Sequence, residues 1–111
     1  GIYELVIRTA VVGQGNRQAN ALHKKTSTYV KASAQAAMME AILEDLTEEE
    51  LTVYKRGRNA KTVSMAKHAT MHDYRHATGF EALMGYLYLT DQMKRMIDLV
   101  KLGMERTEGM P

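Results

Sequence analysis

Residues 70–89 read TMHDYRHATGFEALMGYLYL, and this stretch decides the fold class. The Thr70 hydroxyl can accept a hydrogen bond from the backbone N–H of Asp73, which is typical of a helix start. The larger apolar residues that follow recur at spacings of three and four: Phe80, Leu83, Met84 and Leu87. This spacing places them on one side of a helix. We therefore expect one helix from Thr70 to about Leu89, with that side buried.

The segment upstream carries further signals for helix starts and ends. Thr47 and Glu50 match a capping box, in which each residue satisfies a backbone N–H of the other. Gly57 is expected to end that helix, with residues 58–69 forming a loop or a loop with one helical turn. Ser33 is expected to cap an earlier helix. The apolar stripe of that earlier helix would be Ala34, Ala37, Met38, Ala41 and Ile42.

Both ends of the chain also favour helices. Thr90 or Asp91 is expected to cap the last helix. Its apolar positions would be Met93, Met96, Ile97, Val100 and Met104. Asn20 is expected to cap another helix, and residues 1–13 fit a helix or a strand, of which we take the helix. About six helices and no convincing strand predict an all-α fold, with residues 1–111 as a single domain.

Composition narrows the class of protein. The 111 residues include no cysteine, which excludes disulfides and thiolate metal sites. No apolar run approaches the length needed to cross a bilayer, so we expect a cytoplasmic protein with no membrane partner. Net charge is only +2, but it is segregated: residues 40–50 hold six acids and no base, whereas residues 51–76 hold six bases and one acid. A segregated basic segment of this kind can attract polyanions.

Glu81 is the unusual residue of the 70–89 helix. Its neighbours on the helix surface are small: Ala77, Thr78, Ala82 and Gly85. A carboxylate projecting from such a patch leaves room for a ligand or another backbone to approach closely. From spacing alone, however, a solvated surface charge is the simpler interpretation.

The basic segment from Lys55 to Lys61 suits phosphate binding. It combines closely spaced cations with an amide, and point charges and donors follow a nucleic-acid backbone rather than reading bases. The basic character continues through Lys67 and Arg75. The alternative is a solvated helix end and loop.

Three histidines, His68, His72 and His76, recur at a spacing of four. One continuous helix would align them for zinc or nickel. Because the cap at Thr70 starts the helix after His68, only the pair His72 and His76 would share a face. Surface histidines, or additional donors to a nucleic acid, are the simpler interpretation.

Several segments together are more specific than any one of them. In chain order they are Gly1-Ile2-Tyr3-Glu4-Leu5, Leu22-His23-Lys24, Tyr29-Val30 with Ala34-Gln35-Ala36, Arg56-Gly57-Arg58-Asn59-Ala60-Lys61, Asp73-Tyr74-Arg75, and Glu81-Ala82-Leu83-Met84-Gly85-Tyr86-Leu87-Tyr88-Leu89. This combination resembles Mini-ribonuclease III, the compact bacterial branch of the ribonuclease III family. The resemblance extends from Gly1 to about residue 100. It implies an all-helical, homodimeric endonuclease that cuts double-stranded RNA, with precursors of large-subunit ribosomal RNA as substrate and Mg2+, or alternatively Mn2+, as cofactor.

The resemblance also implies roles for individual residues. Glu81 matches the family's metal-binding glutamate, which reverses the simpler interpretation given above. Thr78 stands where the wider family has an aspartate and would hold a water bound to the metal. Asp73 is a weaker candidate, which would support the direct ligands without binding the metal itself. The RNA-binding set would be Lys55, Arg56, Arg58, Asn59, Lys61, Lys67, Arg75, His23 and Lys24.

One departure from the family keeps a second function open. The resemblance places a principal metal ligand of the family, an aspartate, directly before Gly1, so we expect the sequence to start inside the signature helix. Without that aspartate the chain would be a non-catalytic RNA-binding or ribosome-assembly module on the same fold. A helical interaction protein with a merely solvated basic segment is the third hypothesis.

Overall fold

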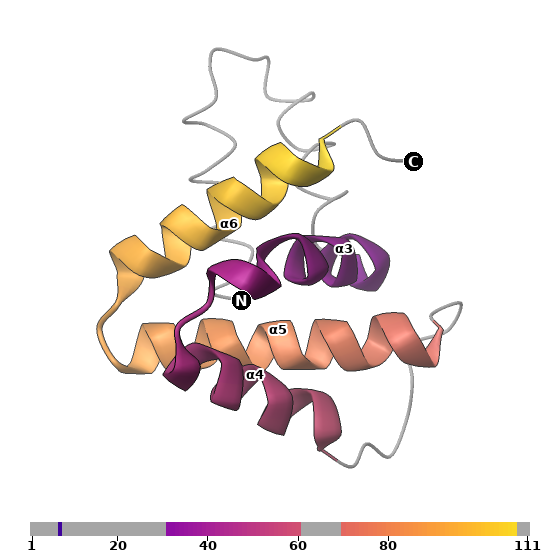
Figure 1. The fold of residues 1–111 in the computed structure, drawn as a ribbon, viewed down its shortest axis with the longest axis horizontal. Helices are drawn as coiled ribbons and strands as arrows, with labels where there is room; N and C mark the ends of the chain where they lie inside the picture. The colour runs from indigo at the N-terminus through magenta and orange to yellow at the C-terminus, as the bar shows by residue number, and fades with distance from the viewer. Residues whose placement is uncertain (1–6, 8–30, 61–69, 109–111) are drawn as a thin grey trace.

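The computed structural model describes Ile7, residues 31–60 and residues 70–108. These residues form α3 (Ala32–Ile42), a short 3-10 turn η1 (Leu43–Asp45), α4 (Glu48–Asn59), α5 (Met71–Leu89) and α6 (Met93–Thr107) (Figure 1). The all-α prediction is confirmed. The helices expected over residues 1–13 and after Asn20 lie outside the described residues, except at Ile7, which is helical and fully buried. Within the described part, no helix is both long and apolar enough to cross a membrane.

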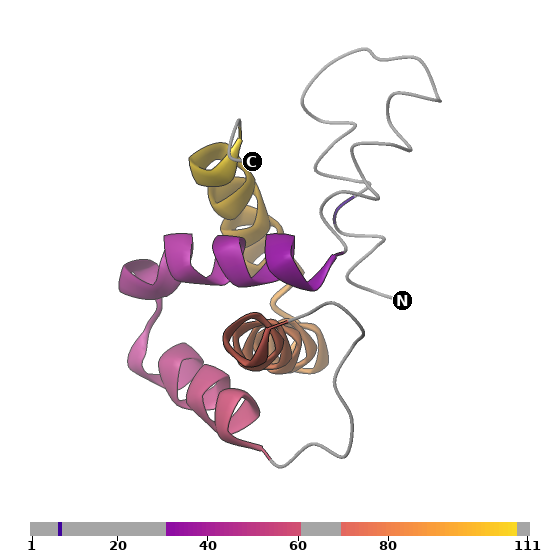
Figure 2. The same cartoon turned by 90° about the vertical axis from the view of Figure 1, so that its right-hand side faces the viewer.

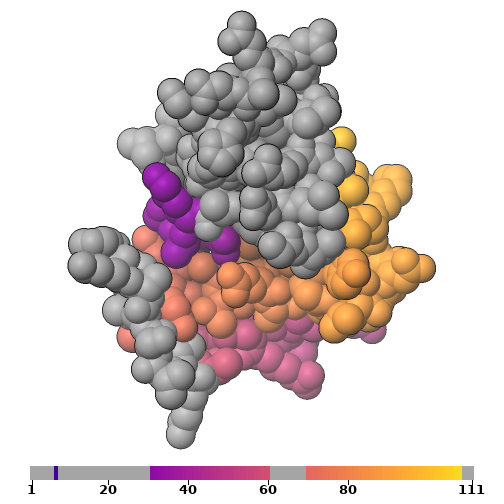
Figure 3. All heavy atoms as spheres, turned by 180° about the vertical axis from the view of Figure 1, so that it is seen from behind, coloured from indigo at the N-terminus to yellow at the C-terminus, as the bar shows by residue number. Residues whose placement is uncertain are grey.

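Helix α5 is the centre of the arrangement. In Figures 1 and 2, α3 lies between α5 and α6, and α4 packs along another side of α5. Seen from behind, the surface of α5 runs across the molecule between α4 and α6 (Figure 3). The buried core joins all four helices and Ile7: Ile7, Met38, Met39, Ile42, Tyr54, Phe80, Leu83, Met84, Leu87, Met96, Leu99, Val100 and Met104. The five methionines of this core are therefore packing residues, since their flexible side chains fill irregular gaps.

Both predicted caps at the starts of α4 and α5 are confirmed. The Thr47 N–H donates to Glu50 Oε1 at 2.9 Å, and the Glu50 N–H donates to Thr47 Oγ1 at 3.2 Å, which completes the capping box. The Asp73 N–H donates to Thr70 Oγ1 at 3.0 Å. The apolar side expected for α5 is also buried, at Phe80, Leu83, Met84 and Leu87.

The prediction that Gly57 ends a helix is wrong, because α4 continues to Asn59. A Cβ placed on Gly57 would lie 2.5 Å from the Ala82 Cβ and 3.1 Å from the Gly79 Cα. The glycine therefore serves a close crossing of α4 over α5 rather than a left-handed helix end. As a result, Arg58 and Asn59 are helical and do not belong to a loop.

The cap and stripe predicted for α3 also need correction. Lys31 is the N-cap and makes no side-chain capping bond, while Ser33 lies inside the first turn. The buried face of α3 is wider than the expected stripe, since this helix packs against α5 and α6 together. Its buried residues are Gln35, Ala36, Met38, Met39 and Ile42.

The turn between α5 and α6 does not use the expected caps. Gln92, rather than Thr90 or Asp91, precedes α6, and it makes no side-chain capping bond. Asp91 instead takes a left-handed backbone conformation with φ 59°. The Gln92 N–H donates to the Leu87 carbonyl at 2.7 Å, so this turn closes the C-terminus of α5 as a Schellman motif does. The buried residues of α6 are Met96, Leu99, Val100, Gly103 and Met104.

Candidate active site

Glu81 lies in the middle of α5 and is exposed. No described residue forms an ion pair or hydrogen bond with its carboxylate. Its surroundings are small, as the sequence predicts: Ala77 is buried, and a Cβ placed on Gly85 would meet nothing within 4 Å. The carboxylate therefore stands on an open patch of α5 with its oxygens available to a ligand.

Thr78 lies one helical turn before Glu81, so the two side chains are neighbours on the surface of α5. The Thr78 hydroxyl donates to the Tyr74 carbonyl at 2.8 Å, which leaves its oxygen lone pairs to accept from a water. Asp73 lies eight residues before Glu81, which corresponds to about 12 Å of helical rise. Its carboxylate lies instead beside His72, with 3.4 Å between Oδ1 and Nδ1. The structure thus brings Thr78 to Glu81 and leaves Asp73 apart.

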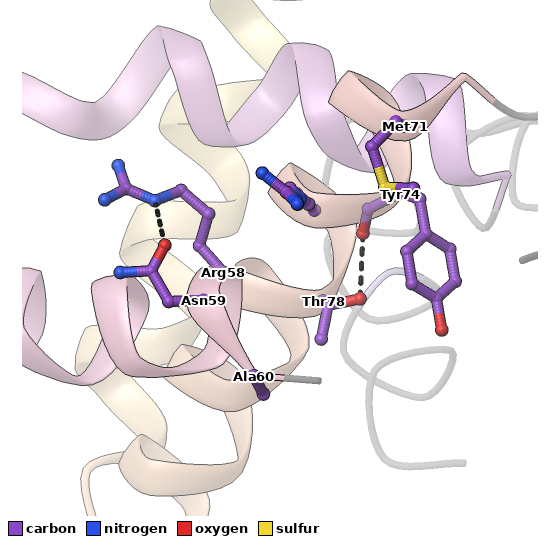
Figure 4. Close-up of a pocket in the computed structure, with 7 residues that line it drawn as sticks. Arg58, Asn59, Ala60, Met71, Tyr74 and Thr78 are labelled. Carbon is purple, nitrogen blue, oxygen red and sulfur yellow. Dashed lines mark hydrogen bonds between the residues drawn. The ribbon is translucent and has the colours of Figure 1, made fainter. Parts of the chain in front are cut away.

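A hollow of about 330 Å³ lies beside Thr78, between the end of α4 and the first turns of α5 (Figure 4). Its lining residues are Arg58, Asn59, Ala60, Met71, Tyr74, Arg75 and Thr78. Three members of the predicted RNA-binding set meet here, and we call this feature the basic hollow. It brings the guanidinium groups of Arg58 and Arg75, from two different helices, to Thr78, which lies one helical turn from Glu81.

Neutral groups hold Arg58 in place at the basic hollow. Its Nε donates to Asn59 Oδ1 at 3.2 Å (Figure 4), and its guanidinium carbon lies 5.6 Å from the centre of the Tyr54 ring. Burial raises the pKa of the Tyr54 hydroxyl, and the positive charge of Arg58 offsets part of that rise. No carboxylate among the described residues pairs with Arg58 or Arg75, so the hollow keeps its positive charge.

The other predicted RNA-binding residues lie elsewhere. Lys55 and Arg56 are exposed on α4 but do not line the basic hollow. Arg56 precedes Arg58 by two positions, which is about 200° around a helix, so it faces another side. The remaining members, together with His68, lie outside the described residues: Lys61, Lys67, His23 and Lys24.

Acidic residues near the start of α4 are used inside the fold. Glu50 is 3% exposed, and Arg95 donates to both of its oxygens at 2.9 Å. The hydrogen bond from Arg95 holds the pKa of Glu50 below its ordinary value, against the opposing effect of burial. Arg106 of α6 likewise pairs with Asp45. Sequence reasoning missed both partners, because an arginine on a distant helix gives no local signal.

Comparisons with known proteins identify the family of this chain. Residues 1–92 match the sequence model of the Ribonuclease III domain. Mini-ribonuclease 3 of Enterococcus faecalis is 52% identical over 101 residues, covering 89% of this chain and 76% of the relative. Mini-ribonuclease 3 of Thermoanaerobacter sp. is 45% identical over 107 residues, covering 96% and 75%. A crystal structure of a Fusobacterium nucleatum protein matches with a TM-score of 0.76 at 29% identity, covering 94% of this chain and 83% of that one. The chain therefore belongs to the ribonuclease III family, in its Mini-ribonuclease 3 branch, and is an endoribonuclease of that type.

Proposed function

We propose that this protein cleaves double-stranded RNA in a magnesium-dependent reaction centred on Glu81. The observation that carries the proposal is the pairing of an open carboxylate with a positively charged hollow, joined through Thr78. Its substrate would be precursors of large-subunit ribosomal RNA, and it would work in the cytoplasm. Membership of the ribonuclease III family supports duplex RNA as the substrate class.

The residues present fit a hard cation better than a soft one. Mg2+ prefers oxygen ligands and keeps several of its waters, so it needs few protein ligands. Glu81 offers carboxylate oxygens, and the Thr78 hydroxyl can hold a water one turn away. Asp73, at about 12 Å along the helix, would act only at a distance. Mn2+ prefers similar oxygen ligands and is the alternative ion. When bound, such an ion lowers the pKa of an attacking water and stabilises the leaving oxygen.

The chain's own residues would hold the RNA backbone. Arg58 and Arg75 place two cations at the basic hollow, and Asn59 adds an amide donor beside them. Duplex RNA is recognised mainly through its shape, phosphates and 2′-hydroxyls, which suits groups that do not read bases. Lys55 would contact the same polyanion from a neighbouring face of α4, whereas Arg56, on the far side of the helix, would contribute mainly through long-range attraction.

We further propose that the active form is a homodimer. One site per subunit would cut each strand of a duplex, and a symmetric pair of sites matches the two-fold symmetry of a double helix. Light scattering of the full chain at micromolar concentration gives the mass directly. A monomer that still cuts both strands would contradict this part of the proposal.

The central test is Glu81→Gln in the full-length protein. The amide keeps the size of the side chain but removes the negative charge that attracts the cation. Cleavage of a long RNA duplex in Mg2+ should fall about a thousandfold or more, equivalent to about 4 kcal/mol of transition-state stabilisation. The melting temperature should stay unchanged, because Glu81 is exposed and pairs with none of the described residues.

Glu105→Gln is the matched control, since Glu105 is an exposed glutamate on α6, away from the basic hollow. It should cut at the parent rate. Full activity of Glu81→Gln would remove this carboxylate from the mechanism. The parent protein could instead bind duplex RNA in a salt-sensitive way and fail to cut it whichever divalent ion is added. That result would replace the nuclease with the non-catalytic RNA-binding or ribosome-assembly module.

A further inference from the structure

Three side chains from two helices converge on the side of the molecule where α3 meets the start of α5. They are Glu40 of α3 and His72 and His76 of α5. Glu40 Oε1 lies 2.8 Å from His72 Nε2 and 3.7 Å from His76 Nε2. The two imidazole rings lie 4.1 Å apart between centres, inclined by 31°. Both ring Nε2 atoms therefore face the same carboxylate oxygen.

The opposite nitrogen of each ring is already engaged. His76 Nδ1 lies 2.9 Å from the His72 carbonyl, which can only accept, so this nitrogen carries the hydrogen. His72 Nδ1 lies 3.4 Å from Asp73 Oδ1, which can accept its hydrogen when Nε2 binds a metal. Without a metal, His72 Nε2 donates its hydrogen to Glu40 Oε1 at 2.8 Å, and a metal ion bound here would take the place of that hydrogen. An imidazole held by a carbonyl or carboxylate at one nitrogen is the usual arrangement of a metal-ligating histidine.

We propose that Glu40, His72 and His76 bind one zinc ion, which links α3 to α5. Two imidazole nitrogens and one carboxylate oxygen form a set of ligands common for zinc, and the fourth position would hold a water. The three ligand atoms lie within 4.8 Å of one another. Tetrahedral zinc needs ligands about 3.4 Å apart, given bonds of about 2.1 Å. Glu40 and His72 are exposed, so small side-chain rotations would close this difference.

This site is separate from the carboxylate at Glu81. His76 precedes Glu81 by five residues, which turns the two side chains about 140° apart around α5. The ligand chemistry differs as well, because imidazole suits zinc, whereas an oxygen-only site suits magnesium. The zinc proposal therefore does not rest on the proposed nuclease mechanism.

The test is calorimetric titration of the full-length protein with ZnCl2, in buffer containing millimolar Mg2+. We expect one zinc per chain, and a rise in melting temperature that a chelator reverses, because a ligand that binds only the folded state stabilises it. Glu40→Gln and His76→Asn should each weaken zinc binding tenfold or more. Glu44→Gln, which changes an exposed glutamate one turn further along, is the matched control and should bind as the parent does.

Glu81→Gln should also keep its zinc affinity, which distinguishes the two sites. Zinc binding of parent strength in both Glu40→Gln and His76→Asn would place the ion elsewhere and overturn the proposal. So would the absence of stoichiometric binding in the parent protein. In that case the three side chains form only an ion pair between a charged histidine and Glu40.

Discussion

The two ends of α4 differ in the sign and in the pairing of their charged side chains. At its start, Glu50 is buried and receives two hydrogen bonds from Arg95, and Glu49 accepts one from the Tyr86 hydroxyl at 3.1 Å. At its end, Arg58 meets Arg75 in the basic hollow without a carboxylate among the described residues. The hollow at the start of α4 is the larger, at about 550 Å³ against about 330 Å³. The sign and pairing of the charges, and not size, therefore distinguish the acidic start of α4, where the Glu50–Arg95 pair belongs to the fold, from its basic end, which we propose binds a polyanion.

Removing the partner of Glu50 at the start of α4 should produce the largest loss of stability. Arg95→Met leaves the buried Glu50 carboxylate without its main partner, and an uncompensated buried charge is costly. We expect the free energy of unfolding to fall by about 3 kcal/mol in urea titrations. Lys94→Met is the control, because Lys94 is 90% exposed in its pair with Asp98, and surface pairs contribute little. Equal effects of the two substitutions would show that burial of Glu50 has no energetic role.

Disturbing the crossing of α4 and α5 at Gly57 should lower the free energy of unfolding somewhat less. In Gly57→Ala the new methyl group would lie 2.5 Å from the Ala82 Cβ, so α4 and α5 must separate. We expect a loss of about 2 kcal/mol in unfolding free energy. Gly85→Ala adds the same methyl group to α5 in open space and should instead stabilise the helix by about 0.5–1 kcal/mol. If both variants behave alike, helix propensity rather than the crossing explains Gly57.

Removing a positive charge at the basic hollow should weaken RNA binding rather than destabilise the fold. Arg58→Gln removes one cation from the basic hollow and should weaken binding to duplex RNA about fivefold, or about 1 kcal/mol. The slope of log affinity against log salt concentration should become shallower by about one. Arg56→Gln removes the same charge from another side of α4 and should weaken binding less than about twofold. Equal losses would show that RNA binding follows net charge, and not the hollow.

Acidification should give the smallest effect, because burial of Glu50 opposes the influence of Arg95 on its pKa. Since the folded-state pKa lies below the ordinary value of 4.5, the ionised Glu50 stabilises the fold above that value. This contribution is lost as pH falls through the lowered pKa. Unfolding titrations from about pH 7 to about pH 3 should therefore show a steeper decline for the parent than for Glu50→Gln. Parallel profiles would contradict the assignment of the pKa shift to Glu50.

Sequence reasoning was accurate for local interactions that a pair of residues signals, and it failed where a lone capping residue was the only signal, as at Ser33 and at Thr90 or Asp91. The caps at Thr47 and Thr70 join residues three apart, so the pattern alone predicts them correctly. Gly57 was misassigned because its role depends on the Gly79–Ala82 surface of another helix, which no local pattern reveals.

The candidate site follows the same rule. Glu81 and its small neighbours lie within one helix, so the sequence predicts their open surroundings. The meeting of Arg58 with Arg75 crosses two helices, and the sequence places both only in one broad basic segment. Glu40 was missed as a partner of His72 and His76 because it comes from α3, in an acidic segment that gave no sign of their position.

The close crossing at Gly57 has a consequence for selectivity. Because Gly57 faces Ala82 and Gly79 with no room for a side chain of its own, α4 and α5 are closely packed at this crossing. Arg58 cannot shift along Thr78 unless the helices part. Donors preorganised in this way lose little conformational entropy when they meet a rigid ligand with regularly spaced phosphates. A flexible single strand would have to become ordered first, so this crossing should favour duplexes over single strands before any base is contacted.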